Sequence, residues 1–182
     1  MSLMSQLYSN DELLALIETA STHHDTRSAT PLPNRRITDT ELEAWIYEYI
    51  ALGGINAFEL RVVLVINEIR ADHGLHPLAI CPNISMAARF RSQEMSESNR
   101  LAHQSPHHGG SVARMRMFGN DRGLGENALG GRATPERVVQ SWMNSPGHRA
   151  MVLNATARTI GVGAIRCDEW SGADRATAKF GF

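Results

Sequence analysis

The chain has 182 residues, of which 42% are hydrophobic and 20% charged, enough to bury the core of one domain with an additional N-terminal segment. Its formal net charge of −1 gives no bulk electrostatic reason to bind nucleic acid, and we expect no nucleic-acid partner. The longest apolar run, residues 62–66, is far too short for a transmembrane segment, and residues 1–4 lack the features of a secretory signal peptide.

Two amphipathic helices are predicted near the N-terminus, each opened by a capping box. Ser9 and Glu12 begin the first helix, and Thr38 and Glu41 begin the second. In each pair, the spacing lets the side chain of one residue bond the backbone N–H of the other. The pair Gly53-Gly54 predicts the end of the second helix.

Residues 22–36, between these helices, are polar and contain two prolines, a composition that favours a linker. We therefore expect residues 1–54 to form a helical N-terminal extension with a Pro-containing linker, and residues 55–182 to form a second domain. Three large aromatic side chains of the extension are interpreted as packing residues: Trp45, Tyr47 and Tyr49.

From residue 55 onward, predicted helices alternate with short strands. The expected elements are a helix from Asn56 to Gly74, a strand at 77–80, a helix capped by Asn83, a short helix at 111–118, a loop with a brief strand at 123–131, a helix starting at Thr134, and strands at 160–166 and 177–181 joined by a turn at 171–174. A three-stranded antiparallel sheet with helices on both faces would bury the apolar residues. The pattern thus predicts an α+β fold, a three-layer α–β–α sandwich.

The helix that starts at Thr134 carries apolar side chains inward at helical spacing, including Val138 and Trp142. The run Ser145-Pro146-Gly147 predicts an abrupt end to this helix, because the residue before a proline avoids helical geometry. We expect a tight turn there to present His148 at the mouth of a cleft.

Two imidazoles and one carboxylate form the candidate site: His103, Glu126 and His148. Neutral imidazole and carboxylate groups bind zinc when no thiolate is offered, and three such ligands leave a fourth position for water. Spacing alone does not select these residues, because no two share a helical turn. Each also has a purely structural interpretation. His103 could cap a loop, Glu126 could accept backbone hydrogen bonds in a glycine-rich turn, and His148 could be a stabilising cation near a helix C-terminus.

Two other interpretations of the polar residues remain open. Ser105 and Ser145 lie near the two histidines in sequence, so a serine hydrolase is conceivable, although neither serine lies in a Gly-x-Ser-x-Gly motif. Cys81 and Cys167 allow either one disulfide bridge or two free thiols.

Several short motifs occur together over residues 58–182. They are Asn67-Glu68-x-Arg70, Gly74-Leu75-x-Pro77-Leu78, Ala87-Ala88 with Met95, His103-x-Ser105-Pro106, Gly125-Glu126-Asn127, Trp142-Met143-x-Ser145-Pro146-Gly147-His148-Arg149, Ile160-Gly161-Val162-Gly163 and Phe180-Gly181. In this order they resemble the CAP superfamily of cysteine-rich secretory proteins, antigen 5 and pathogenesis-related 1 proteins (the SCP domain). The resemblance is to the bacterial, cysteine-poor branch.

The resemblance implies an α–β–α sandwich whose cleft is lined by His103, Glu126 and His148. It further implies a divalent metal, often zinc, as cofactor, a small-molecule or lipid ligand, and an extracellular or cell-envelope location. The sequence departs from the family in places. Ser145 replaces a second Glu of the animal and plant members, and residues 176–178 replace Trp-Thr-Gln, which leaves a less aromatic wall.

The leading hypothesis is therefore a non-enzymatic or weakly catalytic CAP-domain protein whose polar cleft binds a divalent metal and a small or lipidic ligand. The alternative is a metal-assisted or serine hydrolase acting on peptide or cell-wall substrates. In the metal-assisted version Glu126 would be the catalytic general base.

Overall fold

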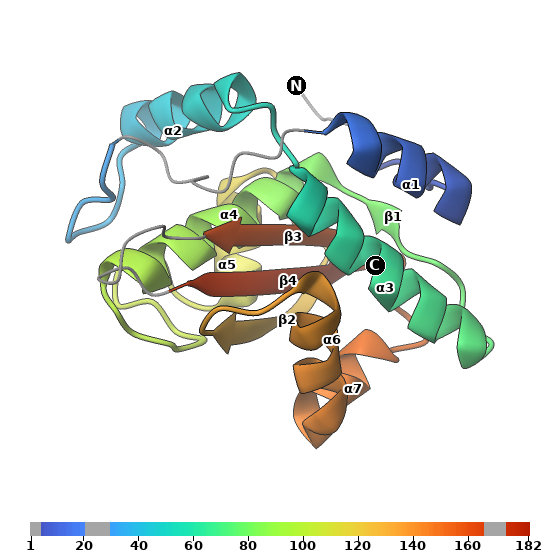
Figure 1. The fold of residues 1–182 in the computed structure, drawn as a ribbon. Helices are drawn as coiled ribbons and strands as arrows, with labels where there is room; N and C mark the ends of the chain where they lie inside the picture. Colours follow the sequence, from blue (N-terminus) through green and yellow to red (C-terminus); the bar gives the residue numbers. More distant parts are fainter. Residues whose placement is uncertain (1–4, 21–29, 166–173) are drawn as a thin grey trace.

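The computed structural model describes residues 5–20, 30–165 and 174–182, which form helices packed on both sides of one sheet (Figure 1). Its elements are α1 (Asn10–Thr19), α2 (Asp39–Ala51), α3 (Ala57–Asp72), β1 (Ala79–Ile80), α4 (Pro82–Glu97), α5 (Ser111–Met117), β2 (Gly123–Gly130), α6 (Pro135–Asn144), α7 (Pro146–Val152), β3 (Thr159–Ile165) and β4 (Arg175–Gly181). Within these ranges, no helix combines the length and the apolar composition needed to cross a bilayer.

The sheet is mixed and has the strand order β1-β3-β4-β2. β4 pairs antiparallel with both β3 and β2, whereas β1 pairs parallel with β3. The predicted α+β class and layered arrangement are confirmed, but the predicted three-stranded, wholly antiparallel sheet is wrong. The sheet differs from the prediction in two ways. Residues 79–80 pair in parallel with the free edge of β3, so the sheet is mixed. The glycine-rich segment 123–130 forms a fourth strand, because β4 supplies its hydrogen-bonding partners.

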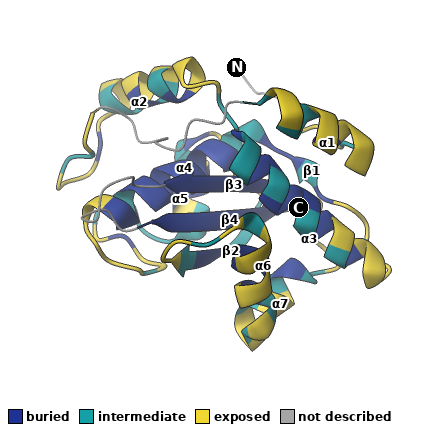
Figure 2. Ribbon diagram, viewed as in Figure 1, coloured by how far each residue is buried: buried dark blue, intermediate teal, exposed yellow. Residues whose placement is uncertain are grey.

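One face of the sheet packs against α3 and α6. Alternate side chains of β3, such as Ile160 and Val162, share a buried apolar cluster with Val62 of α3 and Trp142 of α6. Figure 2 shows the central strands and inward helix faces as buried, while α1 and α2 expose their outer faces. The alternation along β3 therefore divides the core between the two layers of helices.

The other face of β3 lies directly against the backbone of α4. A Cβ atom on Gly163 would lie only 2.0 Å from the backbone nitrogen of Arg89, and one on Gly161 only 2.2 Å from that of Ser85. No side chain fits in such a space, so these two glycines permit the helix to approach the sheet closely. The contact fixes the position of α4 and of the loop that follows it.

The predicted capping boxes of α1 and α2 are confirmed, at Ser9 and Thr38. The predicted cap of α4 at Asn83 is wrong. Cys81 occupies the N-cap position, because Pro82 fits the first helical position, where no backbone N–H is needed. The Asn83 side chain instead donates a hydrogen bond to the backbone oxygen of Phe118.

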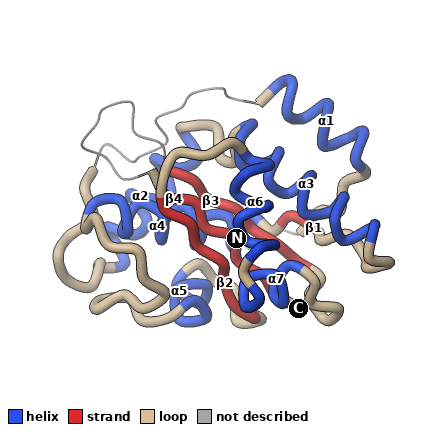
Figure 3. Tube along the Cα trace, turned by 60° about the horizontal axis from the view of Figure 1, so that its bottom comes forward, coloured by secondary structure: helices blue, strands red, loops and turns tan. Residues whose placement is uncertain are grey.

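The N-terminal extension packs onto the rest of the chain. Leu13 of α1 is buried in the same apolar cluster as residues of α3, and α1 lies alongside α3 in Figures 1 and 3. Trp45 of α2 packs edge-on against Phe90 and Phe118 and donates a hydrogen bond of 2.8 Å to Gln93 Oε1. Trp45 and Tyr49 are buried, which confirms their predicted packing roles. Tyr47 is 74% exposed, so the prediction that it packs is wrong.

Some sequence predictions fall outside the described residues. These are the first part of the linker, residues 22–29, together with Cys167 and most of the turn at 171–174. Residues 30–36 are described and form neither helix nor strand, as predicted for a linker. Cys81 is buried.

Substituting Gly163→Ala should lower the free energy of unfolding by at least about 3 kcal/mol, because the added methyl group collides with the backbone of α4. Gly147→Ala is the matched control, since nothing lies within 4 Å of its added Cβ and alanine favours the helix. Urea denaturation of both variants measures the difference. Equal stability of the two variants would contradict the close approach of α4.

The division at residues 54 and 55 stays a prediction, which limited trypsin digestion can examine at Arg35 and Arg36. We expect Trp45→Ala to accelerate cleavage there, because removing a buried Trp costs about 3–5 kcal/mol and loosens α2. Tyr47→Ala removes an exposed ring from the same helix and should cleave like the wild type. If Trp45→Ala is cleaved no faster, α2 does not hold the extension in place.

Candidate functional site

The structure brings His103, Glu126 and His148 together at β2, an edge strand of the sheet. His103 lies in the loop after α4, Glu126 in β2 and His148 in α7. The Nδ1 atom of His103 is 3.2 Å from Oε1 of Glu126, and the ring centroids of His103 and His148 are 6.2 Å apart. Three segments distant in sequence thus converge on one place, as the sequence analysis expected.

The position of His148 differs from the predicted tight turn. α6 ends at Asn144, but Pro146 then occupies the first position of a new helix, α7, whose first turn contains His148. Proline ends one helix and opens the next because its fixed φ angle suits a helix start. Asn127 of β2 donates a hydrogen bond of 2.9 Å to the backbone oxygen of His148, which holds α7 against the sheet.

Glu126 is the buried centre of a cluster of charges. Its side chain is 2% exposed, and Arg114 Nη2 donates to its two oxygens at 2.8 and 2.9 Å. Lys179 Nζ donates to Oε2 of the same carboxylate. Burial alone would raise the pKa of Glu126, but the bond from His103 and the charges of the two cations hold this pKa well below its ordinary value.

Arg114 and Lys179 were missed by the sequence analysis. Lys179 lies in β4 directly opposite Glu126 in the antiparallel register, so this is a cross-strand pair of opposite charges. The pairing signal exists in the sequence only once residues 123–130 are recognised as a strand. Burial is the strongest influence on the ammonium group and lowers the pKa of Lys179 to about 8, although Glu126 acts in the opposite direction.

The carboxylate determines which nitrogen of His103 is available. Glu126 is ionised and accepts, so in the neutral form of His103 the hydrogen lies on Nδ1 and the lone pair on Nε2. The side chain of His103 is 58% exposed and can meet a ligand from solvent. Burial, and then the neighbouring His103, lower the pKa of His148, which favours the neutral form of the His148 imidazole.

The metal-ligating capacity of the site is concentrated in this imidazole pair, His103 and His148. Among residues 5–20, 30–165 and 174–182, no three His, Cys, Asp or Glu side chains are grouped so as to hold a metal ion. Glu126 was predicted as a third ligand, but its oxygens already accept from Arg114, Lys179 and His103. In this arrangement Glu126 orients an imidazole and neutralises cations.

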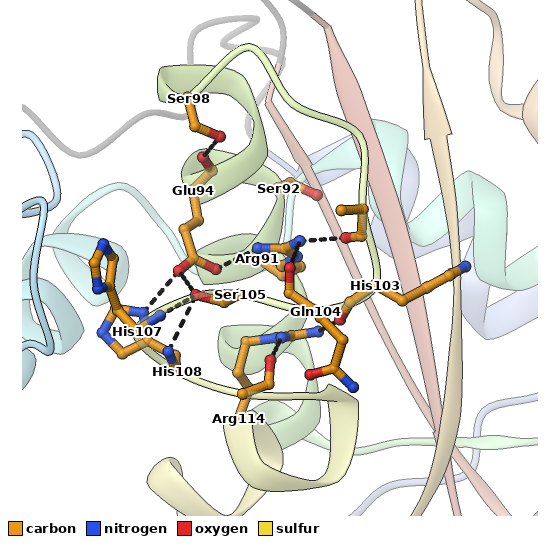
Figure 4. Close-up of polar contacts among 12 residues, drawn as sticks. Arg91, Ser92, Glu94, Ser98, His103, Gln104, Ser105, His107, His108 and Arg114 are labelled. Carbon is orange, nitrogen blue, oxygen red and sulfur yellow. Dashed lines mark hydrogen bonds and ion pairs between the residues drawn. The ribbon is translucent and has the colours of Figure 1, made fainter.

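A second polar cluster lies on the other side of the His103 loop (Figure 4). Glu94 accepts hydrogen bonds from Ser105, from His108 Nδ1 at 2.7 Å and from Arg91 Nη1 at 2.6 Å. The Nε2 atom of His108 accepts from the backbone N–H of Ile37 at 3.1 Å, which connects the cluster to the N-terminal extension. Ser105 therefore bonds Glu94 and not His103, so these two residues do not form a serine–histidine pair.

Comparison with known proteins identifies similar sequences. The model of the "Cysteine-rich secretory protein family", CAP, matches residues 63–180. The protein YkwD of Bacillus subtilis is 42% identical over 116 residues, which are 63% of this chain and 45% of YkwD. The Bacillus subtilis membrane protein YlbC is 31% identical over 109 residues, which are 59% of this chain and 32% of YlbC. The chain thus spans less than half the length of these relatives.

Solved structures show the same fold. An extracellular protein containing an SCP domain from Bacillus anthracis matches with a TM-score of 0.63 and 25% identity, over 84% of this chain and 45% of that chain. An outer surface protein from Borrelia burgdorferi matches with a TM-score of 0.57 and 20% identity, over 66% of this chain and 88% of that chain. The Bacillus anthracis match reaches beyond residues 63–180, into the chain that precedes them.

The cluster around Glu94 should make stability depend on acid pH. Burial acts to raise the pKa of Glu94, but its hydrogen bonds, led by the one from His108, outweigh burial and lower the pKa to about 2. The unfolded chain therefore binds the proton first, so this stabilisation is complete above about pH 5 and is lost as the pH falls towards 2. It amounts to at most about 3 kcal/mol.

We expect Glu94→Gln to lower the free energy of unfolding at pH 7 and to converge with the wild type at pH 2–3. Urea denaturation at several pH values measures the difference. Glu43→Gln removes an exposed carboxylate of α2 and should leave the pH profile unchanged. A Glu94→Gln variant with the wild-type profile would show that this carboxylate contributes no pH-dependent stability.

Proposed function

The chain belongs to the cysteine-rich secretory protein (CAP) family, and on that premise we propose that it binds a divalent cation, with zinc as the expected ion, at the imidazole pair. The ligands would be Nε2 of His103 and a ring nitrogen of His148. Imidazole nitrogen suits zinc and related transition metals. Solvent or a bound molecule would complete the coordination.

The observation that carries this proposal is the contact between Glu126 and Nδ1 of His103. A histidine that binds a metal usually donates its other ring N–H to a carboxylate or carbonyl, which fixes the tautomer and the ring orientation. Glu126 is itself held by Arg114 and Lys179, so it supplies this partner in a fixed position. The resting arrangement is thus the one that a ligating imidazole needs.

The role of Glu126 favours binding over hydrolysis. A bound ion would supply Lewis acidity, and the coordination positions that the protein does not fill would be open to a polar group of a ligand. An effective general base needs a pKa near the working pH, whereas the pKa of Glu126 is well below its ordinary value. Its ion pairs therefore support a positioning role. The hydrolase alternative predicts turnover of a peptide or cell-wall substrate that Glu126→Gln abolishes.

We also propose an extracellular or cell-surface location and a small-molecule or lipid ligand. Support for the location comes from the Bacillus anthracis relative, which is described as extracellular. Support for a ligand comes from the open imidazole of His103, whose side chain is accessible from solvent beside a buried charge cluster.

Zinc titration by calorimetry at pH 7.5 tests the imidazole pair. We expect His103→Ala and His148→Ala each to weaken zinc binding by at least about tenfold, because each removes one of two protein ligands. His107→Ala is the matched control: its ring lies in the same loop but contacts Asn34 and His108.

Circular dichroism and urea denaturation would establish that each variant is folded. If the wild type and the His103→Ala, His148→Ala double variant bind zinc with equal affinity, the proposed site is wrong. The same holds if His107→Ala weakens binding as much as the other two variants do.

A further inference from the structure

A cavity of about 380 Å³ lies between the N-terminal extension and the loop that carries His103. Residues 32–34 of the extension form one wall. The other walls come from the C-terminal half of α4 and from the loop after it, through Ser98, Arg100, Gln104, Pro106 and His107. In Figure 4, His103 points away from the side of the loop where Glu94 and His107 lie. Neither His103, Glu126 nor His148 lines the cavity, so it is distinct from the imidazole pair.

The carboxylates that line this cavity already have hydrogen-bond donors. Glu94 accepts from Arg91, Ser105 and His108. Glu97 accepts from the backbone N–H of Leu32 at 2.9 Å and from the Gln93 amide at 2.8 Å. Both acids therefore serve to hold the cavity walls together.

The cationic and amide groups of the walls still have donors to give. The guanidinium of Arg100 is exposed and makes no hydrogen bond or ion pair with the part of the chain that the structure describes. The Gln104 amide makes no hydrogen bond there either, but its Nε2 lies beside Gly110, which does not line the cavity. Arg91 is 4% exposed, yet its Nε–H has no partner among the described residues. Unused donors beside satisfied acceptors favour a ligand that accepts hydrogen bonds.

The shape and the remaining charges narrow the class of ligand. The volume lies in the range of small-molecule sites and exceeds that of a single inorganic anion. Leu32, Pro33 and Pro106 supply an apolar part of the wall. Glu94 and Glu97 disfavour a multiply charged anion by repulsion, whereas one carboxylate can pair with the fork of a guanidinium.

We propose that this cavity binds a small carboxylic acid that carries an apolar group, with its carboxylate paired to Arg100. Such a group is found at the C-terminus of a peptide and in free organic acids of similar size. Arg100 would hold the carboxylate, and the apolar group would lie against Leu32 and Pro33.

The cavity and the imidazole pair share a loop but no side chain. Arg91 Nη2 donates to the backbone oxygens of Ala102 and Gln104, which flank His103. Because Arg100 is not a proposed metal ligand, it can be substituted while His103 and His148 are kept. Failure of one proposal is thus distinguishable from failure of the other.

Titration of the full chain, followed through its backbone amide resonances, tests the cavity. The probes are N-acetyl-L-alanyl-L-alanine, its C-terminal amide, propionate and inorganic phosphate. We expect the acid to shift the resonances of Asn34 and Gln104 and to bind at least about tenfold more tightly than the amide, which lacks the charge. A dipeptide acid that binds more tightly than propionate indicates a peptide C-terminus, and equal affinities indicate a free acid.

Arg100→Gln should weaken binding of the acid by at least about tenfold. Arg116→Gln, which removes an exposed guanidinium of α5, should leave the affinity unchanged. The proposal would be overturned if the acid and the amide bound with equal affinity, or if phosphate bound more tightly than either acid. It would also be overturned if Arg100→Gln bound the acid as tightly as the wild type, or if neither acid gave a saturable shift up to about 10 mM.

Discussion

The contact between the backbones of α4 and β3 is the constraint on which the rest of the structure depends. Gly161 and Gly163 present only hydrogen atoms to the helix, so α4 lies closer to the sheet than any side chain would allow. A buried ion pair reinforces the arrangement, because Glu59 of α3 accepts from both Arg89 of α4 and the backbone N–H of Ala164 in β3, each at 2.8 Å. The two helical layers and the strand between them are thereby joined at one point.

The candidate site follows from this placement. With α4 fixed, the loop after it contacts β4, where Asn99 accepts a hydrogen bond from Arg175, and β2, where His103 reaches Glu126. Burying the charges of Glu126, Arg114 and Lys179 is costly, and a packed apolar cluster would be at least as stable. The charges instead fix the position of the Glu126 carboxylate. This carboxylate in turn holds the exposed imidazole of His103 in one tautomer and one orientation.

The N-terminal extension belongs to the same architecture. Trp45 lies among aromatic side chains of α4 and of the residue that follows α5, and Ile37 donates its backbone N–H to the buried His108. Residues 32–34 complete the wall of a cavity that the residues matched by the family model do not enclose alone. The extension therefore gives this chain a surface that is separate from the imidazole pair.

The sequence by itself determined the local features whose causes lie within a few residues. Capping boxes begin α1 and α2, and alternation of apolar residues marks β3, because these signals depend on neighbouring backbone and side-chain geometry. An ordered series of motifs also indicated the family. The three predicted site residues could be chosen from that resemblance, although their spacing alone carried no signal.

Only the tertiary structure decided the features that depend on distant partners. The segment 123–130 is a strand because β4 lies beside it, and Lys179 becomes a partner of Glu126 only through that register. Likewise, Ser145-Pro146 could end a helix or start one, and packing against β2 selected a second helix that carries His148. Hydrogen bonding between strands and burial of charge are long-range effects, so no local window of this sequence contains them.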